Sequence, residues 1–265
     1  MQKRYEFDNP TLNTIFNRRS VRVFKDAPIS EEIKDTIITG AKRAPTAGNM
    51  MFYSILEVDD QAKKDKLAVT CDNQPFIAKT PLVLIFLADY QKWFEYDQYC
   101  DVQGMCERKD IVYDEPRESN LMMCTVDAVI AAQNAVITAQ ALGLTSVYIG
   151  DIMEHYETHK EMFNLPKYTF PVAMLCIGYA KHPEKLNEVT PRFPNTLVYH
   201  KDSYDPWTES KLKEFDAELN KMRQIPDRFK DDFKNQGQFL YWMKSGAEFT
   251  KEMIRSVKEM LKNWK

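Results

Sequence analysis

The pattern of apolar and polar residues predicts a chain of helices and strands. A short helix is expected over residues 10–18, after the cap-like pair Asn9-Pro10, and a second from the N-cap Ser30 to just before Pro45. Their apolar residues recur at helical spacing: Leu12, Ile15, Phe16, Ile33, Ile37, Ile38 and Ala41. Each helix is therefore expected to bury one face.

Four stretches have the composition of strands. Residues 53–58 and 145–149 are rich in β-branched and apolar residues, residues 81–88 form an almost unbroken apolar run, and residues 170–177 end at Gly178. An unbroken apolar run is typical of a strand that is covered on both faces. In addition, residues 21–24 are expected to be extended, and the charged residues 61–79 to be helical in part.

The most apolar helical segment covers residues 121–142. Its whole circumference is apolar except for Asp127, Gln133, Asn134 and Gln140, which predicts a helix buried in the middle of the structure and ended by Gly143. Further helices are expected near residues 207–223 and 238–264. The last one carries an apolar stripe that must pack on the core or on a second subunit: Phe239, Met243, Ile254, Val257, Leu261 and Trp264.

Residues 90–120 differ in character from the rest of the chain. They hold eight acidic against four basic residues, with aromatic residues between them and Pro116 near the end. Loops of this length without obvious structure are often lids or binding loops, and a plain disordered excursion is the alternative. We therefore expect an inserted loop here.

Composition narrows the class of protein. Among 265 residues, 44% are apolar and 12% aromatic, which supports a substantial core, and the net charge of −3 argues against a nucleic-acid partner. The first ten residues lack the apolar segment of a signal peptide, and we expect no run to reach the ~18 apolar residues of a membrane span. We expect a cytoplasmic protein that binds no membrane, with five reduced cysteines.

Three arginines and a serine stand together near the N-terminus, with no acidic neighbour. They are Arg18, Arg19, Ser20 and Arg22. A guanidinium offers planar donors that match phosphate oxygens and stays charged at any working pH. The cluster predicts a phosphate site, and a solvated basic turn or a nucleic-acid patch remains open from these residues alone.

The sequence gives little support for a metal site, for the usual nucleotide-binding motifs or for a serine hydrolase. His155 and His159 stand four residues apart, but Tyr156 occupies the position of a metalloprotease glutamate and no third ligand is evident, so no metal site is expected. The glycine-rich patterns of dinucleotide-binding folds, phosphate-binding loops and serine hydrolases do not occur in the sequence. No residue is expected to act as a nucleophile or as a general acid or base.

A set of motifs in this order resembles the FMN-dependent nitroreductase family over residues 10–202. Residues 18–22 resemble its N-terminal flavin motif, residues 45–49 its Pro-Ser-Ser-x-Asn loop, and Gln74 stands where the family often has a flavin-contacting amide. Residues 143–150 resemble the strand and glycine beside the flavin ring, and Pro191-Arg192 its late phosphate-binding arginine. Thr46-Ala47 in place of two serines, Asp151 in place of glycine and the uncharged Thr190 depart from the family pattern.

The resemblance implies how these residues would bind FMN. Arg18, Ser20 and Arg192 would contact the phosphate, Arg19 the phosphate or ribityl chain, and Arg22 the N1 and O2 atoms of the ring, where two-electron reduction builds negative charge. Gly150 and Asp151, after Ile149, would offer backbone N–H groups to N5 and O4. The remaining contacts would come from the other subunit of a homodimer: Pro45, Thr46, Ala47 and Asn49.

The same resemblance implies the fold and the reaction. The fold would be α+β, with a mainly antiparallel sheet flanked by helices, a buried central helix and a C-terminal helical extension. Residues 1–202 would form the FMN-binding domain, with residues 90–120 as an inserted lid, and residues 203–265 the extension. NAD(P)H would reduce FMN, which would pass the electrons to a nitroaromatic, quinone or similar acceptor in a ping-pong reaction, with Trp93, Phe94 and Tyr96 available to stack on it.

Two alternatives stay open at this point. One is a specialised member of the same family that destroys flavin or removes halogen reductively. The other is a non-catalytic FMN carrier or interaction protein that uses its C-terminal helices to bind a partner.

Overall fold

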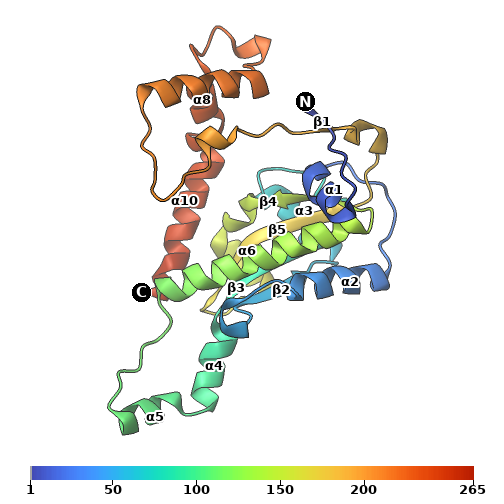
Figure 1. Ribbon diagram of the computed structural model, residues 1–265. Helices are drawn as coiled ribbons and strands as arrows, with labels where there is room; N and C mark the ends of the chain where they lie inside the picture. Colours follow the sequence, from blue (N-terminus) through green and yellow to red (C-terminus); the bar gives the residue numbers. More distant parts are fainter. Residues whose placement is uncertain (1) are drawn as a thin grey trace.

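A four-stranded antiparallel sheet forms the centre of the computed structural model, which describes residues 2–265 (Figure 1). Its strand order is β2-β3-β5-β4, and every neighbouring pair is antiparallel. The strands are β2 (Tyr53–Glu57), β3 (Leu82–Asp89), β4 (Thr145–Ile149) and β5 (Thr169–Gly178). All four lie where the sequence predicts a strand, and the α+β prediction is confirmed.

Helices cover both faces of this sheet because β3 is apolar on both sides. Leu82, Leu84 and Phe86 point into a core with α2 (Glu31–Lys42) and α6 (Glu118–Ala141). The alternate residues of β3, including Val83 and Ile85, point into a second core with α3 (Gln61–Thr70). Side chains alternate along a strand, so a continuous apolar run places apolar groups in two layers at once. A further helix, α7 (Tyr156–Phe163), lies beside the C-terminal helix α10 (Glu248–Leu261).

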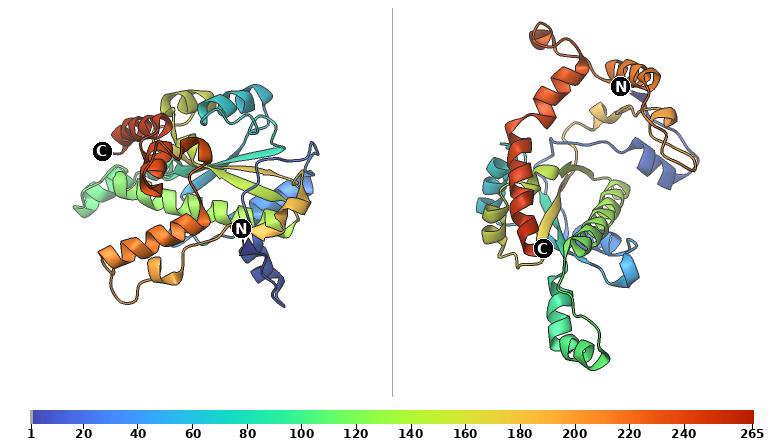
Figure 2. Two further views of the ribbon diagram at one scale, coloured as in Figure 1. Left: turned by 90° about the horizontal axis from the view of Figure 1, so that it is seen from above. Right: turned by 90° about the vertical axis from the view of Figure 1, so that its left-hand side faces the viewer.

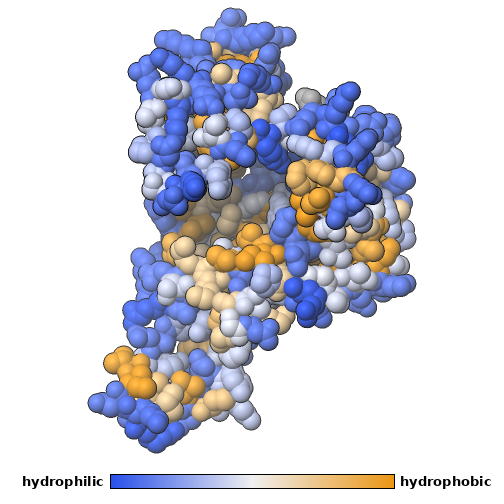
Figure 3. Space-filling view, viewed as in Figure 1, coloured by the Kyte–Doolittle hydropathy of each residue, from blue (hydrophilic) through white to orange (hydrophobic). Residues whose placement is uncertain are grey.

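Only one side of α6 is buried, which corrects the expectation of a helix enclosed all round. Its inner face consists mainly of alanines such as Ala128 and Ala132, with no exposed surface, and packs on α2 and the sheet. Its outer face leaves Met122 67%, Val126 54% and Val129 43% exposed. Figure 3 shows apolar atoms gathered across the middle of this face, where α6 lies in the same view of Figure 1. A single chain therefore leaves an apolar surface without a cover.

By length and composition, α6 could also cross a membrane. It is the one such helix among residues 2–265, with a mean hydropathy of 1.5 over its most apolar window. The expectation that no segment is long and apolar enough to span a membrane was therefore wrong. The inner face of α6 packs on the sheet, as in the core helix of a globular protein.

Residues 90–120 are helical rather than a structureless loop. They form α4 (Gln91–Tyr99) and α5 (Val102–Lys109), followed by an extended return to α6. Together they make an arm that projects away from the sheet in Figure 1 and in the right-hand view of Figure 2. The left-handed Asp101, with φ 50°, caps α5 by accepting from the N–H of Gly104 through its side chain. The apolar pattern of the sequence did not predict these two helices, because both are short and exposed and bury no continuous apolar face.

The last helix predicted from the sequence is interrupted. Its first part is α9 (Gln236–Leu240) with a π-helical turn at Tyr241–Ser245, and its second part is α10 (Glu248–Leu261), ended by a 3-10 turn at Lys262–Trp264. The break falls at Gly246 and Ala247, where the backbone of Ala247 becomes extended with ψ 157°. The preceding helix α8 (Glu209–Met222) agrees with the prediction.

The apolar stripe of this C-terminal region packs on the chain's own core. Trp264 is fully buried and Met260 is 2% exposed, both in the core that contains α6, whereas Ile254 of the expected stripe is 51% exposed. The change of direction at Gly246 explains why Ile254 does not continue the stripe of Phe239. Among the described residues, the extension therefore shares the main core.

The N-terminal region is held at the edge of the sheet. Helix α1 (Pro10–Asn17) has the predicted Asn9 cap, and a short strand β1 (Gln2–Lys3) pairs with β6 (Glu188–Val189), a contact that the sequence did not predict. Residues 21–24 are extended but form only isolated bridges, Ser20 with Ser146 and Phe24 with Ala180. Short 3-10 turns complete the structure: Ala47–Asn49, Gly150–Met153, Pro183–Leu186, Asn195–Leu197 and Asp227–Phe229.

Candidate flavin site

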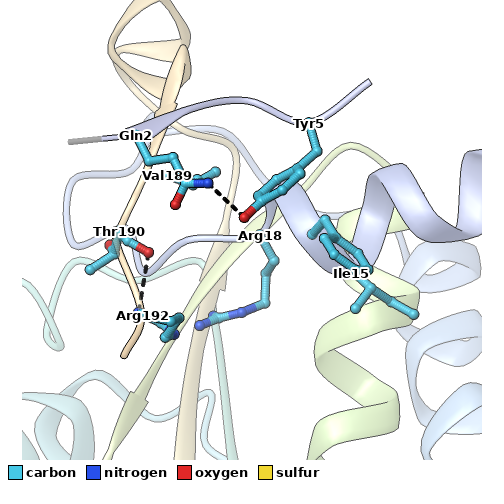
Figure 4. A pocket seen from close by; sticks show the side chains of 8 residues that line it. Gln2, Tyr5, Ile15, Arg18, Val189, Thr190 and Arg192 are labelled. Carbon is cyan, nitrogen blue, oxygen red and sulfur yellow. Dashed lines mark hydrogen bonds between the residues drawn. The ribbon is translucent and has the colours of Figure 1, made fainter. Parts of the chain in front are cut away.

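Two arginines that are far apart in the sequence line one pocket. Arg18 follows α1 and Arg192 follows β6, and their side chains point toward each other in Figure 4. The pocket has a volume of about 290 Å³ and is lined by Gln2, Tyr5, Ile15, Phe16, Arg18, Val189, Thr190 and Arg192. The structure thus brings together two of the three side chains expected to hold a phosphate.

The charges in this pocket are not balanced within the described chain. The Nη1 atom of Arg18 is buried and has no hydrogen-bond partner among residues 2–265. Burial, together with the positive charge of Arg192, lowers the pKa of Arg18 from its usual value. Two guanidinium groups held together with a buried donor unpaired form a site that an anion would stabilise. These residues fit a phosphate group.

Arg19 lies beside this pocket and supports it from outside. Its Nη1 atom donates to the backbone oxygens of Lys185 and Glu188, at 3.0 Å each. Both acceptors precede Arg192 in the same segment. Arg19 therefore joins the arginine cluster to the segment of Arg192, and its predicted contact with the flavin stays a prediction.

Ser20 and Arg22 are exposed on the same extended stretch. The stretch is attached to the start of β4, because Ser20 forms a parallel bridge with Ser146 and the Val21 N–H donates to the Ser146 oxygen at 3.1 Å. Strand β4 then runs to Ile149 and Gly150. The strand expected beside the flavin ring is thus physically joined to the arginine cluster.

A buried carboxylate on α6 organises the loop that carries Pro45, Thr46, Ala47 and Asn49. The side chain of Asp127, 3% exposed, accepts hydrogen bonds from the Thr46 hydroxyl, the Ala47 N–H at 3.2 Å and the Phe52 N–H at 3.3 Å. The Thr46 hydroxyl oxygen in turn accepts from the Met51 N–H at 2.8 Å. Sequence reasoning noted Asp127 only as a polar exception in an apolar helix, which was the available signal of its role.

The turn Gly150–Met153 is joined to the segment that follows α3. The amide of Gln74 donates from Nε2 to Oδ2 of Asp151 at 2.8 Å and to the Cys71 oxygen at 3.0 Å. Gln74 was expected to contact the flavin through its amide, and Asp151 to offer a backbone N–H group to the ring. The structure places them in direct contact with each other.

Glu154, at the end of this turn, is a buried acid that sequence reasoning missed. Its side chain is 2% exposed and Oε1 has no hydrogen-bond partner among the described residues. Burial, followed by the nearby charges of Asp151, Asp72 and Glu252, raises the pKa of Glu154 to about 8. An acid in a charged, turn-forming sequence gives no signal of burial, and one of the charges near Glu154, Glu252, lies on α10, about 100 residues later in the chain.

The aromatic residues proposed for the lid divide into two groups. Trp93 is half-buried, and its Nε1 donates to the Met50 oxygen at 2.9 Å, while Phe94 packs edge-on against Tyr168 at 5.0 Å. Tyr96 is 55% exposed and makes an edge contact with Trp93. Only Tyr96 is largely free of the core, and Trp93 connects the arm to the loop of residues 45–52.

The two neighbouring histidines are separated by the structure. His155 precedes α7 and its backbone N–H donates to Glu252, whereas His159 is fully buried between Thr70 and the Ile152 oxygen. Burial lowers the pKa of His159 to about 4, so this imidazole is neutral at neutral pH. Among residues 2–265, no group of three or more His, Cys, Asp or Glu residues could hold a metal ion.

Comparisons with known proteins agree with this arrangement. Residues 15–179 match the model of the nitroreductase family. The chain is 34% identical over 203 residues, 76% of its length, to an FMN reductase (NADPH) of Bacillus subtilis strain 168, covering 77% of that protein. It is 30% identical over 254 residues, 94% of its length, to a Cr(VI) reductase of Pseudomonas sp. strain G-1, covering 97% of that protein.

Solved structures show the same fold. The structure of NfrA2 from B. megaterium is 27% identical, with a TM-score of 0.72 over 94% of this chain and 97% of that one. The structure of NADPH:FMN oxidoreductase from Vibrio harveyi complexed with NAD+ is 24% identical, with a TM-score of 0.76 over 96% and 98% of the two chains. The matched segment includes Arg18, the loop of residues 45–49, Gln74 and Asp151, and the chain belongs to the nitroreductase family.

Proposed function

We propose that this protein is an FMN-dependent NAD(P)H oxidoreductase that reduces electron-poor acceptors such as nitroaromatics or quinones. The observation that carries the proposal is the pairing of Arg18 with Arg192 around a buried, unpaired guanidinium nitrogen, in a chain of the nitroreductase family. Curated relatives that bear the names FMN reductase (NADPH) and NADPH-flavin oxidoreductase support the cofactor and favour NADPH as the donor.

The phosphate of FMN would lie between Arg18 and Arg192, with Ser20 as a third contact. Charge-assisted bonds from guanidinium groups contribute about 1.5–3 kcal/mol each. Binding at a Kd near 1 µM needs about 8 kcal/mol in total, so two such contacts supply a large part of it and the ring contacts the rest. Arg19 would act mainly by holding the Arg192 segment in place.

The ring end of FMN would meet backbone donors and one cation. Arg22 would place a positive charge near N1 and O2, and the N–H groups of Gly150 and Asp151 would face N5 and O4, held by Gln74 through its bond to Asp151. Bound FMN would supply the redox chemistry, taking electrons from a nicotinamide and passing them to the acceptor. The protein's own residues bind, orient and stabilise charge, and none of them has to transfer a proton or form a covalent bond.

The active protein would be a homodimer with FMN at the subunit interface. Helix α6 offers an apolar outer face that a second copy would cover, with Met122, Met123, Val126 and Val129 exposed in the single chain. The loop of residues 45–49, held on α6 by Asp127, would then reach the flavin of the other subunit. The helix that carries the interface thus also positions this loop.

Acceptor choice would depend on the arm of residues 90–120, with Tyr96 as its exposed aromatic residue and with Trp93 and Phe94 holding its base. Residues 1–202 would be the flavin-binding unit and residues 203–265 an extension that shares its core. The protein would work as a soluble enzyme of the cytoplasm.

Steady-state kinetics test this proposal. The protein loaded with FMN is expected to oxidise NADPH in the presence of p-benzoquinone or nitrofurazone, with parallel double-reciprocal lines, because donor and acceptor use the same place in turn. An FMN-loaded dimer that oxidises neither NADPH nor NADH with any of these acceptors would support the non-catalytic alternative instead.

A further inference from the structure

Residues 2–7, here named the N-terminal strap, lie across the two segments that carry Arg18 and Arg192. At one end, Gln2 pairs with Val189 and Lys3 with Glu188 in the β1-β6 ladder. At the other end, the strap runs along α1, which directly precedes Arg18. The strap therefore connects two segments whose arginines repel each other when no anion is present.

Two asparagines on one face of α1 hold the strap through its backbone. Asn17, 7% exposed, accepts from the Tyr5 N–H at 2.8 Å and donates to the Tyr5 oxygen at 2.9 Å. Asn13 makes the same pair of bonds with Phe7, at 2.9 and 2.8 Å. Asn13 and Asn17 are four residues apart and so share a helix face. Paired bonds on alternate strap residues fix both its position and its direction.

Aromatic packing fixes the side chain of Tyr5 over the pocket. Its ring meets Phe16 edge-on at 5.1 Å and stacks on Phe7 at 6.0 Å. Its hydroxyl oxygen accepts a hydrogen bond from Gln2 Nε2 at 2.6 Å. Figure 4 shows Gln2 and Tyr5 on the same side of the pocket, above Arg18 and Arg192. The strap thus contributes two uncharged side chains to the wall, whereas the cations come from elsewhere.

This wall has a chemical consequence for the ligand. The phosphate of FMN ends the molecule and carries two negative charges, whereas in FAD the same phosphate continues into an adenylate. The pocket of about 290 Å³ has the two arginines on one side and the strap on the other, and it has room for a terminal phosphate. A longer phosphate ester that leaves the pocket on the strap side would meet Tyr5 and Gln2.

We infer that the N-terminal strap closes the phosphate end of the flavin site, so that Tyr5 slows the release of FMN and selects FMN against FAD. This inference rests on the proposed function, because it requires that the pocket of Arg18 and Arg192 receive the flavin phosphate. It assigns a specificity-determining role to a segment that precedes the arginine motif.

The test uses the full-length chain and three ligands: FMN, FAD and riboflavin, which lacks the phosphate. Equilibrium dialysis gives the affinities, and stopped-flow fluorescence after mixing with excess apoflavodoxin as an FMN trap gives the FMN dissociation rate. The variants are Tyr5→Ala, Tyr5→Phe, which keeps the ring and removes the hydroxyl, and the control Tyr204→Ala. Tyr204 is 68% exposed in the C-terminal extension and does not line the pocket.

Removal of the Tyr5 ring is expected to speed FMN release by about tenfold and to lower the preference for FMN over FAD by a similar factor, as one lost aromatic wall contact would give. Riboflavin affinity should not change, and Tyr5→Phe and Tyr204→Ala should behave like the wild type. An unchanged FMN preference in Tyr5→Ala would overturn the inference. An equal loss of affinity for FMN, FAD and riboflavin would also overturn it, because the effect would then not lie at the phosphate end of the flavin.

Failure of the proposed function gives a different pattern. A wild-type protein that binds none of the three flavins would overturn the function and the strap's role together. A wild-type protein that binds FMN tightly, with strap variants that retain its preference, would overturn the strap's role alone.

Discussion

The Nε2 atom of Gln74 donates a hydrogen bond to Oδ2 of Asp151 over 2.8 Å, although 77 residues separate them in the sequence. This bond joins the segment after α3 to the turn that follows β4. Each segment carries a residue that is proposed to contact the flavin. The same principle recurs in the site: Asp127 holds the loop of residues 45–52, and Arg19 holds the segment of Arg192. Residues next to the proposed ligand are positioned by partners that need not touch it.

The carboxylate of Asp127 should be needed for both loop structure and flavin affinity. Asp127→Asn replaces one of the two acceptor oxygens with an NH2 group that cannot accept a hydrogen bond, which leaves at least one buried donor unpaired and should cost about 1–3 kcal/mol in unfolding free energy. FMN affinity should fall as well, because the loop of residues 45–49 loses its anchor. Urea unfolding and FMN titration measure the two effects.

A matched control for Asp127 is Asp89→Asn. Asp89 is also buried, at 7% exposed, but its side chain is bonded to Ser54 and not to the loop. The Asp89→Asn variant should be less stable than the wild type, while its FMN affinity should stay close to that of the wild type. Equal FMN affinities for the two variants would show that Asp127 acts on stability alone.

Removal of Arg192 should change ligand binding and stability in different directions. Arg192→Ala should weaken FMN binding by about 10- to 100-fold, the worth of one charge-assisted contact. Without flavin, however, the variant should be as stable as the wild type or slightly more so, because Arg18 loses a repelling neighbour. Thermal unfolding with and without FMN separates these effects. The control is Arg108→Ala, which removes an exposed ion pair on the arm. It should change neither the FMN affinity nor the thermal stability.

Glu154 should make the flavin-free protein less stable as the pH rises. Its pKa is raised in the folded state to about 8, from an ordinary value of 4.5. The folded protein therefore holds this proton more tightly than the unfolded chain, so the contribution of Glu154 is complete below pH 4.5 and is lost between about pH 4.5 and 8. Each pKa unit corresponds to about 1.4 kcal/mol, which sets the order of magnitude at a few kcal/mol.

The variant Glu154→Gln isolates this effect. Urea unfolding of wild type and variant from pH 5 to pH 8.5 should give a stability difference that favours the variant increasingly toward high pH. If the difference between the two proteins stays constant across this range, Glu154 does not carry a raised pKa in the folded protein.

Ser256 on α10 should stabilise the turn beside the proposed flavin ring. Its hydroxyl is fully buried, donates to the Met153 oxygen at 2.6 Å and accepts from the Tyr156 N–H at 2.9 Å. Ser256→Ala leaves both backbone groups without this partner and should cost about 1–3 kcal/mol. Hydrogen exchange at the amide of Tyr156 should accelerate. Ser210→Ala, on the exposed surface of α8, should show neither change.

Much of the fold was predictable because its elements are regular. The four strands and the helices α1, α2, α6 and α8 follow from apolar periodicity and from caps such as Asn9 and Ser30, which are local signals. The arm of residues 90–120 and the break at Gly246 were not predicted, since short exposed helices and a change of helix direction leave no periodic pattern. The β1-β6 pair depends on a contact between the two ends of the flavin-binding region, which no local signal reports.

The candidate site was predictable where it consists of motifs. Arg18, Gln74, Asp151 and Arg192 were chosen from sequence, and the structure places them in two pairs. Tyr5 was missed because its proposed role depends on the pocket that Arg18 and Arg192 form, and Glu154 because its sequence context gives no signal of burial. Asp127 was visible as a polar residue in an apolar helix, but its partner loop was not.

The proposed function requires that the protein bind FMN and reduce it with a nicotinamide. The most direct test is an anaerobic titration of the FMN-loaded protein with NADPH, followed by absorbance in the region of the oxidised flavin. The yellow colour should bleach in proportion to the NADPH added and return when p-benzoquinone is admitted. A protein that binds FMN and stays yellow with excess NADPH and with excess NADH would contradict the proposed function.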